Sequence, residues 1–118
     1  MFYIDSLNKI YLTRGDDAEI IVKLYDDKGI ERQIFDDDEI IITVRKTISS
    51  PIGFTKTAEK GGIINIAPTD TEGLEFGDYI YDIQLTTFGG KTYTVIPPST
   101  FEIGPEVSVW VKLKQQFK

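Results

Sequence analysis

The chain has 118 residues, a length that suits one domain, and its 19 acidic and 13 basic side chains give a formal net charge of −6. It contains no cysteine and no histidine, which excludes disulfides and thiolate zinc sites and removes the commonest general base. Because no cluster of Lys and Arg appears, we expect no nucleic-acid partner.

The N-terminal stretch "MFYIDSLNKIYL" does not have the pattern of a secretory signal peptide. Such a peptide begins with basic residues and continues into an apolar core. The apolar runs in the chain are only a few residues long, which is too short to span a bilayer. We therefore expect no signal peptide and no membrane partner.

Alternating apolar and polar residues, the pattern of half-buried strands, recur along the chain. These stretches are rich in β-branched and aromatic residues, which favour strands. Strands are predicted at 8–13, 18–25, 39–46, 62–68, 78–87, 91–96, 99–104 and 107–113. No stretch keeps a helical apolar period over three turns. The pattern predicts an all-β fold.

Turn residues separate these runs. "DDKG" (26–29) and "FGGK" (88–91) predict hairpin turns, in which glycine supplies a positive φ. Loops are predicted at 49–53, 59–62 and 96–99. "TDTEGLEFG" (69–77) is the one candidate for a helical turn, with Thr69 or Asp70 as its cap. The short strands and regular turns point to an all-β sandwich or barrel, and we predict one domain over residues 1–118, with a frayed tail at 114–118.

The stretch "GDYIYDIQL" (77–85) places a carboxylate among alternating apolar residues. In a half-buried strand, Tyr79, Tyr81, Ile83 and Leu85 face the core and Asp82 faces outward. A catalytic carboxylate usually needs a partner group, and none is evident, so Asp82 is interpreted as solvated. Tyr79 is predicted to form a structural corner, its hydroxyl returning to the backbone a few residues upstream.

Two other motifs have alternative interpretations. "RGD" (14–16) is an integrin ligand in some settings, but it precedes a strand here and is interpreted as a turn. The acidic residues 26–27 and 36–39 lack the spacing of a calcium loop and are interpreted as solvated. No metal or other cofactor is predicted.

Outward positions on the predicted strands are candidates for an interface. Trp110 and Lys112 share the outer face of the strand at 107–113, and tryptophan is enriched at interface centres. Ile21 and Ile41 fall on the polar phase of their strands, in sheets that the sequence does not specify. The predicted interface set consists of Trp110, Lys112, Ile21, Ile41 and Phe117. Protein contact is favoured, and stacking of Trp110 on a sugar ring is the alternative.

The segments "LTRGDDAEI", "DDEIIITVRK", "IAPTDTEGLEFGDYIYDIQL" and "GGKTYTVIPPSTFEIGPEV" together resemble a known group. They are similar to the small immunoglobulin-like domains of baseplate and tail proteins, such as the N-terminal modules of baseplate upper proteins, in phages and prophages of Gram-positive bacteria. The similarity covers residues from about 10 to 108. It rests on the order of strands and turns rather than on a chemical motif.

This resemblance implies an immunoglobulin-like β-sandwich of about seven to nine antiparallel strands that serves as a non-enzymatic structural module. Its partners would be protein subunits, including further copies of the chain in a homo-oligomer. Its location would be the virion tail, or the host cytoplasm before assembly. Two alternatives stay open from the residues: a carbohydrate-binding module for surface recognition, and a hydrolase that uses carboxylates alone.

Overall fold

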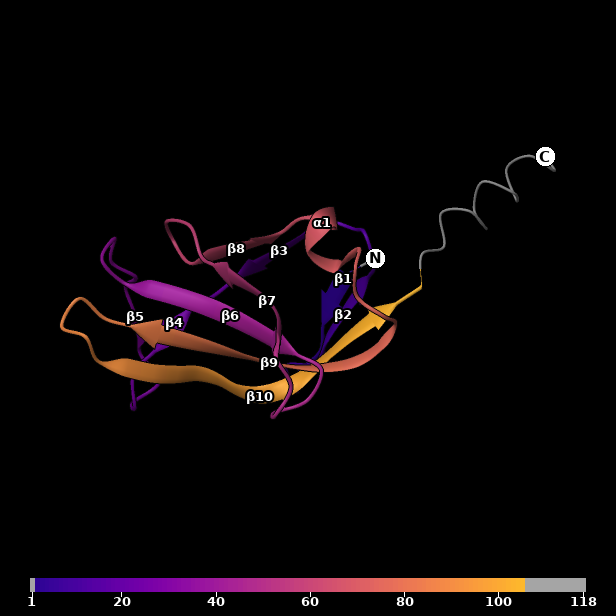
Figure 1. Cartoon of the computed structure of the whole chain (residues 1–118). Helices are drawn as coiled ribbons and strands as arrows, with labels where there is room; N and C mark the ends of the chain where they lie inside the picture. Colours follow the sequence, from indigo (N-terminus) through magenta and orange to yellow (C-terminus); the bar gives the residue numbers. More distant parts are fainter. Residues whose placement is uncertain (1, 106–118) are drawn as a thin grey trace.

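The computed structural model describes residues 2–105, which form ten strands and one short helix (Figure 1). The long strands are β6 (Glu39–Arg45), β7 (Ile52–Thr57), β9 (Gly77–Thr86) and β10 (Thr92–Gly104). The shorter elements are β1 (Phe2–Ile4), β2 (Ile10–Thr13), β3 (Ala18–Ile21), β4 (Leu24–Tyr25), β5 (Glu31–Arg32), β8 (Ile63–Ile66) and the helix α1 (Pro68–Thr71). The all-β prediction is confirmed.

Six of the strands form one sheet in the order β1-β2-β10-β9-β6-β7, while β3–β8 and β4–β5 form two-stranded sheets. The expectation that all strands are antiparallel is wrong at one place, because β2 runs parallel to β10 with Ile10 opposite Phe101. Parallel neighbours need a long connection. Here most of the chain separates the two strands, so the last strand can lie beside an early one in the same direction.

The core lies between the six-stranded sheet and the β3–β8 pair, which lies over it (Figure 1). Ile20 and Ile64 from the small sheet belong to the same buried cluster as Ile42 and Ile83 from the large sheet. Phe101 packs edge-on against Tyr81, with the ring centroids 6.0 Å apart. Side chains from both layers therefore bury each other's apolar faces.

The predicted alternation in β9 is confirmed. Tyr79, Tyr81, Ile83 and Leu85 are all buried, whereas Asp82 is half-buried on the opposite face. The neighbouring strand β6 pairs antiparallel with β9 and shows the same alternation, with its buried residues opposite those of β9. Side chains at every second position thus define an inner and an outer face of the sheet.

Several predicted boundaries were wrong. Residues 52–57 form the edge strand β7, although 49–53 was predicted to be a loop. Residues 96–99 lie inside β10, where register shifts at Ile96 and Ser99 break the ladder. Pro97 and Pro98 have no N–H to donate, and such irregular positions accommodate them without loss of a ladder bond.

The helical turn is present at Pro68–Thr71, but its predicted cap was wrong. Ala67 is the N-cap residue, and the Asp70 carboxylate accepts a hydrogen bond from the Ala67 N–H at 2.7 Å. Asp70 also pairs with Lys56 on the edge strand β7, at 3.0 Å. The carboxylate therefore closes the first turn of the helix from its third position and also joins the helix to the sheet.

Candidate functional site

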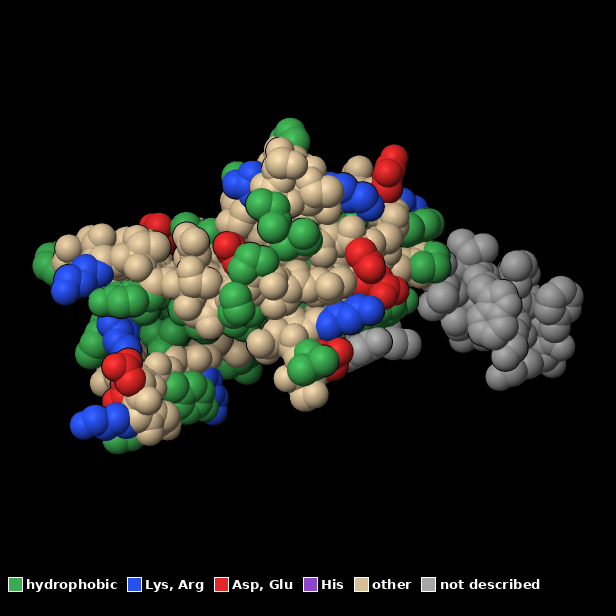
Figure 2. Space-filling view, turned by 90° about the horizontal axis from the view of Figure 1, so that it is seen from below, with side chains coloured by type: hydrophobic (Ala, Val, Ile, Leu, Met, Phe, Trp, Pro, Cys, Tyr) green, Lys and Arg blue, Asp and Glu red, His purple; other side chains and the backbone are tan. Residues whose placement is uncertain are grey.

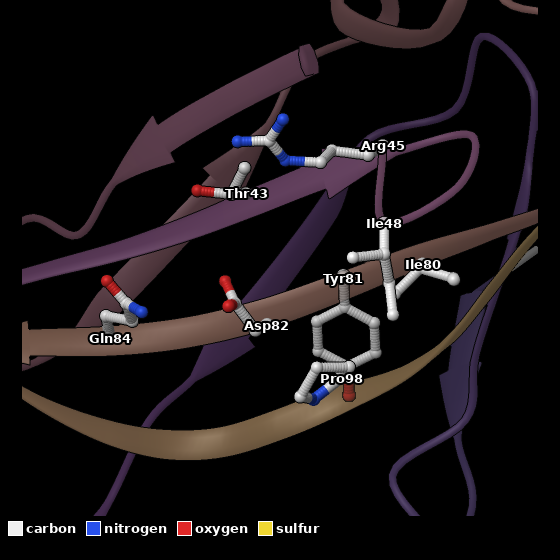
Figure 3. Close-up of a pocket in the computed structure, with 8 residues that line it drawn as sticks. All are labelled: Thr43, Arg45, Ile48, Ile80, Tyr81, Asp82, Gln84 and Pro98. Atoms are coloured by element: carbon white, nitrogen blue, oxygen red, sulfur yellow. The ribbon is translucent and has the colours of Figure 1, made fainter. Parts of the chain in front are cut away.

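The outer face of the six-stranded sheet carries a hollow of about 190 Å³ (Figure 3). Thr43 on β6 lies opposite Asp82 on β9, and both project from the same side of the sheet. The remaining lining residues come from β6, β9, β10 and the loop after β6; they are Arg45, Ile48, Ile80, Tyr81, Gln84 and Pro98.

The loop after β6 forms one rim of this hollow. Arg45 donates a hydrogen bond from its guanidinium to the carbonyl oxygen of Ser50, at 2.9 Å. The Ser50 hydroxyl lies 2.6 Å from that of Thr47, which closes the turn. The turn presents Ile48 to solvent with 73% of its surface exposed. An apolar side chain therefore projects beside a charged and polar floor.

Asp82 is the only carboxylate among the described residues that line the hollow. A hydrolase based on acidic residues alone uses two carboxyl groups that flank the scissile bond. The lining of this hollow does not supply that pair. Its chemistry is that of a mixed contact surface, with a guanidinium, an amide, a hydroxyl, one carboxylate and aliphatic side chains.

Tyr81 forms part of the floor from the core side. Its hydroxyl donates a hydrogen bond to the carbonyl oxygen of Asn8, which ties β9 to the turn before β2. Burial raises the pKa of the Tyr81 phenol to about 12, with a smaller contribution from the charge of Asp5. The ring is 1% exposed. Tyr81 thus supports the sheet beneath the hollow and is neutral at ordinary pH.

The two isoleucines predicted to make contacts lie on different sheets. Ile41 is half-buried on β6, opposite Gln84, and so extends the same outer face as the hollow. Ile21 ends β3 in the two-stranded sheet and is 61% exposed. The structure does not bring them together. Trp110, Lys112, Phe117, the strand predicted at 107–113 and the tail at 114–118 lie outside the described residues.

The "RGD" sequence forms a tight turn, as predicted. Gly15 has a φ of 83°, and the Asp16 N–H bonds to the Thr13 carbonyl at 3.1 Å. The Gly15 N–H donates to the hydroxyl of the buried Thr71 at 2.9 Å. Arg14 lies over the ring of Phe76, with its guanidinium carbon 4.2 Å from the centroid. The turn is therefore held against α1 and the segment that follows it.

The acidic segment before β6 has a structural role at one residue. Arg32 donates two hydrogen bonds to the Asp38 carboxylate, and the shorter N–O distance is 2.6 Å. The same carboxylate accepts a hydrogen bond from the Phe35 N–H at 2.8 Å. The hydrogen bond from Arg32 holds the pKa of Asp38 below its usual value, and the backbone bond adds to this. Across residues 2–105, no group of three or more acidic side chains is placed to hold a metal ion.

A second, larger cleft of about 550 Å³ lies where the β4–β5 and β9–β10 hairpins come together. Tyr25 and Tyr93 line it, from β4 and β10 respectively. Sequence reasoning missed both residues, because nothing in the local pattern shows that the two hairpins meet; Tyr25 falls on the outward phase of its strand, whereas Tyr93 lies opposite the buried Leu85 on the inner face. Tyr25 carried one sequence signal, an aromatic ring at a polar position of its strand.

Comparison with known proteins gives no family assignment. No protein-family model matches the chain, and no curated protein matches it. Within residues 2–105, no helix has the length and apolar character needed to cross a membrane.

Proposed function

We propose that this chain is a non-enzymatic structural module of a phage or prophage tail or baseplate, and that it docks to neighbouring protein subunits, including copies of itself. The observation that carries the proposal is the outer face of the six-stranded sheet. There, Ile48, Ile80 and Pro98 line a shallow hollow together with Arg45 and Asp82. Protein interfaces likewise combine exposed apolar side chains with arginine and other polar groups.

The strand arrangement supports the immunoglobulin-like part of the proposal. In immunoglobulin domains, the second and fifth main strands pair in one sheet, and the third, sixth and seventh form the other. The pair β3–β8 and the run β6-β9-β10 follow that order. Tyr79 supplies a further feature, because its hydroxyl donates to the Glu75 carbonyl just upstream, as in a tyrosine corner.

The free edge of the large sheet supports docking through the outer face rather than through the edge. On β7, the outermost strand at one side, Lys56 pairs with Asp70 of α1. Lysine on an edge strand discourages uncontrolled strand pairing.

Mass spectrometry of phage particles tests the assignment to a virion. Particles induced from the source strain are purified by density gradient and analysed alongside the cell lysate. We expect peptides of this chain to co-purify with the particles, and its gene to lie among tail and capsid genes. A chain that is abundant in the lysate but missing from the particles would contradict the proposal.

A further inference from the structure

We propose that the cleft between the β4–β5 and β9–β10 hairpins binds a neutral sugar ring of a glycan chain. This site is separate from the outer-face hollow and does not depend on the structural role proposed above. Its volume of about 550 Å³ falls within the usual range for small-ligand sites, roughly 300–1,000 Å³. Figure 2 shows a hollow with hydrophobic side chains between the two projecting ends at the left of the molecule.

Two aromatic rings give the cleft its stacking surface. Tyr25 is 60% exposed and Tyr93 is 52% exposed, although both line the cleft. Each ring therefore keeps a large surface open to a ligand. Leu24, Leu85 and Val95 also line the cleft and contribute apolar surface. A pyranose ring has an apolar C–H face, which suits an aromatic platform with an apolar floor beneath it.

The polar groups of the same cleft match the hydroxyls at the edge of a sugar ring. Lys23 and Arg32 contribute donors, and Asp27 contributes an acceptor. Thr87 and Thr94 add hydroxyls that both donate and accept. An entirely apolar ligand would leave these groups without hydrogen-bond partners, which carries a free-energy cost.

The charges of the cleft favour a neutral ligand over an anionic one. Arg32 is already paired with Asp38 through two N–O contacts, the shorter at 2.6 Å. Lys23 is balanced by Asp27 in the same lining. The charge of Arg32 is thus neutralised by Asp38 beside the cleft and that of Lys23 is offset by Asp27 within it, so no excess positive charge remains to select a phosphate or sulfate group.

The walls are held in place before any ligand binds. Tyr93 pairs with Leu85 in the β9–β10 ladder, and Tyr25 pairs with Glu31 in the β4–β5 ladder. Arg32 is fixed by Asp38 and lies near the ring of Phe35, 5.1 Å from its centroid. A preformed site of this kind loses less conformational entropy when a ligand binds.

The test is an NMR titration of the full chain with a defined panel. The probes are tetrasaccharides of glucose, galactose, mannose, rhamnose and N-acetylglucosamine, together with inorganic phosphate and a sulfated disaccharide. We expect at least one neutral tetrasaccharide to shift amide signals of 23–32 and 85–95, and Tyr93→Ala or Tyr25→Ala to weaken that binding by about tenfold.

Phe88→Ala is the matched control, because Phe88 is an aromatic residue that is 84% exposed on the same β9–β10 turn but does not line the cleft. The Phe88→Ala variant should bind the tetrasaccharide as tightly as the unmodified chain does. The Tyr93→Phe variant should also bind it, because the aromatic ring is kept. The inference is overturned if no neutral tetrasaccharide binds at millimolar concentration, if only the charged probes bind, or if the shifts map away from the cleft.

Discussion

The hydroxyl of Tyr79 donates a hydrogen bond to the carbonyl oxygen of Glu75 at 2.9 Å, which fixes the chain as it enters β9. Tyr79 is almost fully buried, so its ring packs in the core while its hydroxyl holds the preceding loop. Burial is also the main reason that the pKa of Tyr79 is raised. The residue therefore links the core to the corner that precedes the strand.

Removing this hydroxyl tests the corner. Tyr79→Phe keeps the ring and loses the hydrogen bond, so we expect the free energy of unfolding to fall by about 1 kcal/mol. Urea denaturation measures the change. Tyr25→Phe removes an exposed hydroxyl and serves as the control. Equal stability of the two variants would show that the corner bond contributes nothing.

The contact between the Gly15 N–H and the Thr71 hydroxyl gives a second prediction. Thr71→Val keeps the shape of this fully buried side chain but removes the acceptor. Because the Gly15 N–H then loses its partner, we expect a loss of about 1–3 kcal/mol in thermal or urea unfolding. Thr55→Val, at an exposed position on β7, should change stability little; similar losses in both variants would contradict this prediction.

Acid should weaken the fold through Asp38. Its pKa is lowered in the folded chain, so its contribution is present above the ordinary carboxyl pKa of about 3.9 and is lost as pH falls below that value. Asp38→Asn should therefore show a shallower loss of stability below about pH 4 than the unmodified chain. Asp37→Asn, the exposed neighbour, is the control. The prediction fails if the acid transitions of the two variants coincide.

Alkali should weaken the fold through Tyr81. Its pKa is raised to about 12 in the folded chain, above the unfolded value of about 10. The unfolded state therefore releases its proton first, and stability falls as pH rises from about 10 to about 12, by roughly 2 kcal/mol. Tyr81→Phe should be less stable at neutral pH but show a smaller decline in this window, and denaturation curves at several pH values would measure both effects. An unchanged alkaline slope would contradict this account.

The inner faces of the sheets were predictable because successive side chains of a half-buried strand are alternately buried and exposed. The pattern through Tyr79, Tyr81 and Ile83 allowed only one inward face, and the structure confirms it. The edge strand β7 was harder to predict, since Phe54 is the only apolar side chain of that strand that packs against the core. Its pattern therefore carries little of the alternation that marks a half-buried strand.

The candidate sites depend on pairings that local patterns do not contain. The outer-face hollow needs Thr43 opposite Asp82, which follows from the β6–β9 register rather than from either segment. The cleft needs Tyr25 and Tyr93 in one lining, although their hairpins are far apart in the chain. The parallel pairing of β2 with β10 is likewise a long-range property. Sequence patterns identified the faces of these strands but not their partners.

Sedimentation equilibrium over a wide range of concentrations tests most directly whether the outer face is a docking surface. We predict that the chain self-associates reversibly, that Ile48→Asp on the rim of the hollow abolishes the association, and that Phe88→Asp, at an equally exposed site on another turn, leaves it unchanged. The proposal that the outer face is a docking surface would be contradicted by a chain that stays monomeric at every concentration, or by an association that Ile48→Asp does not weaken.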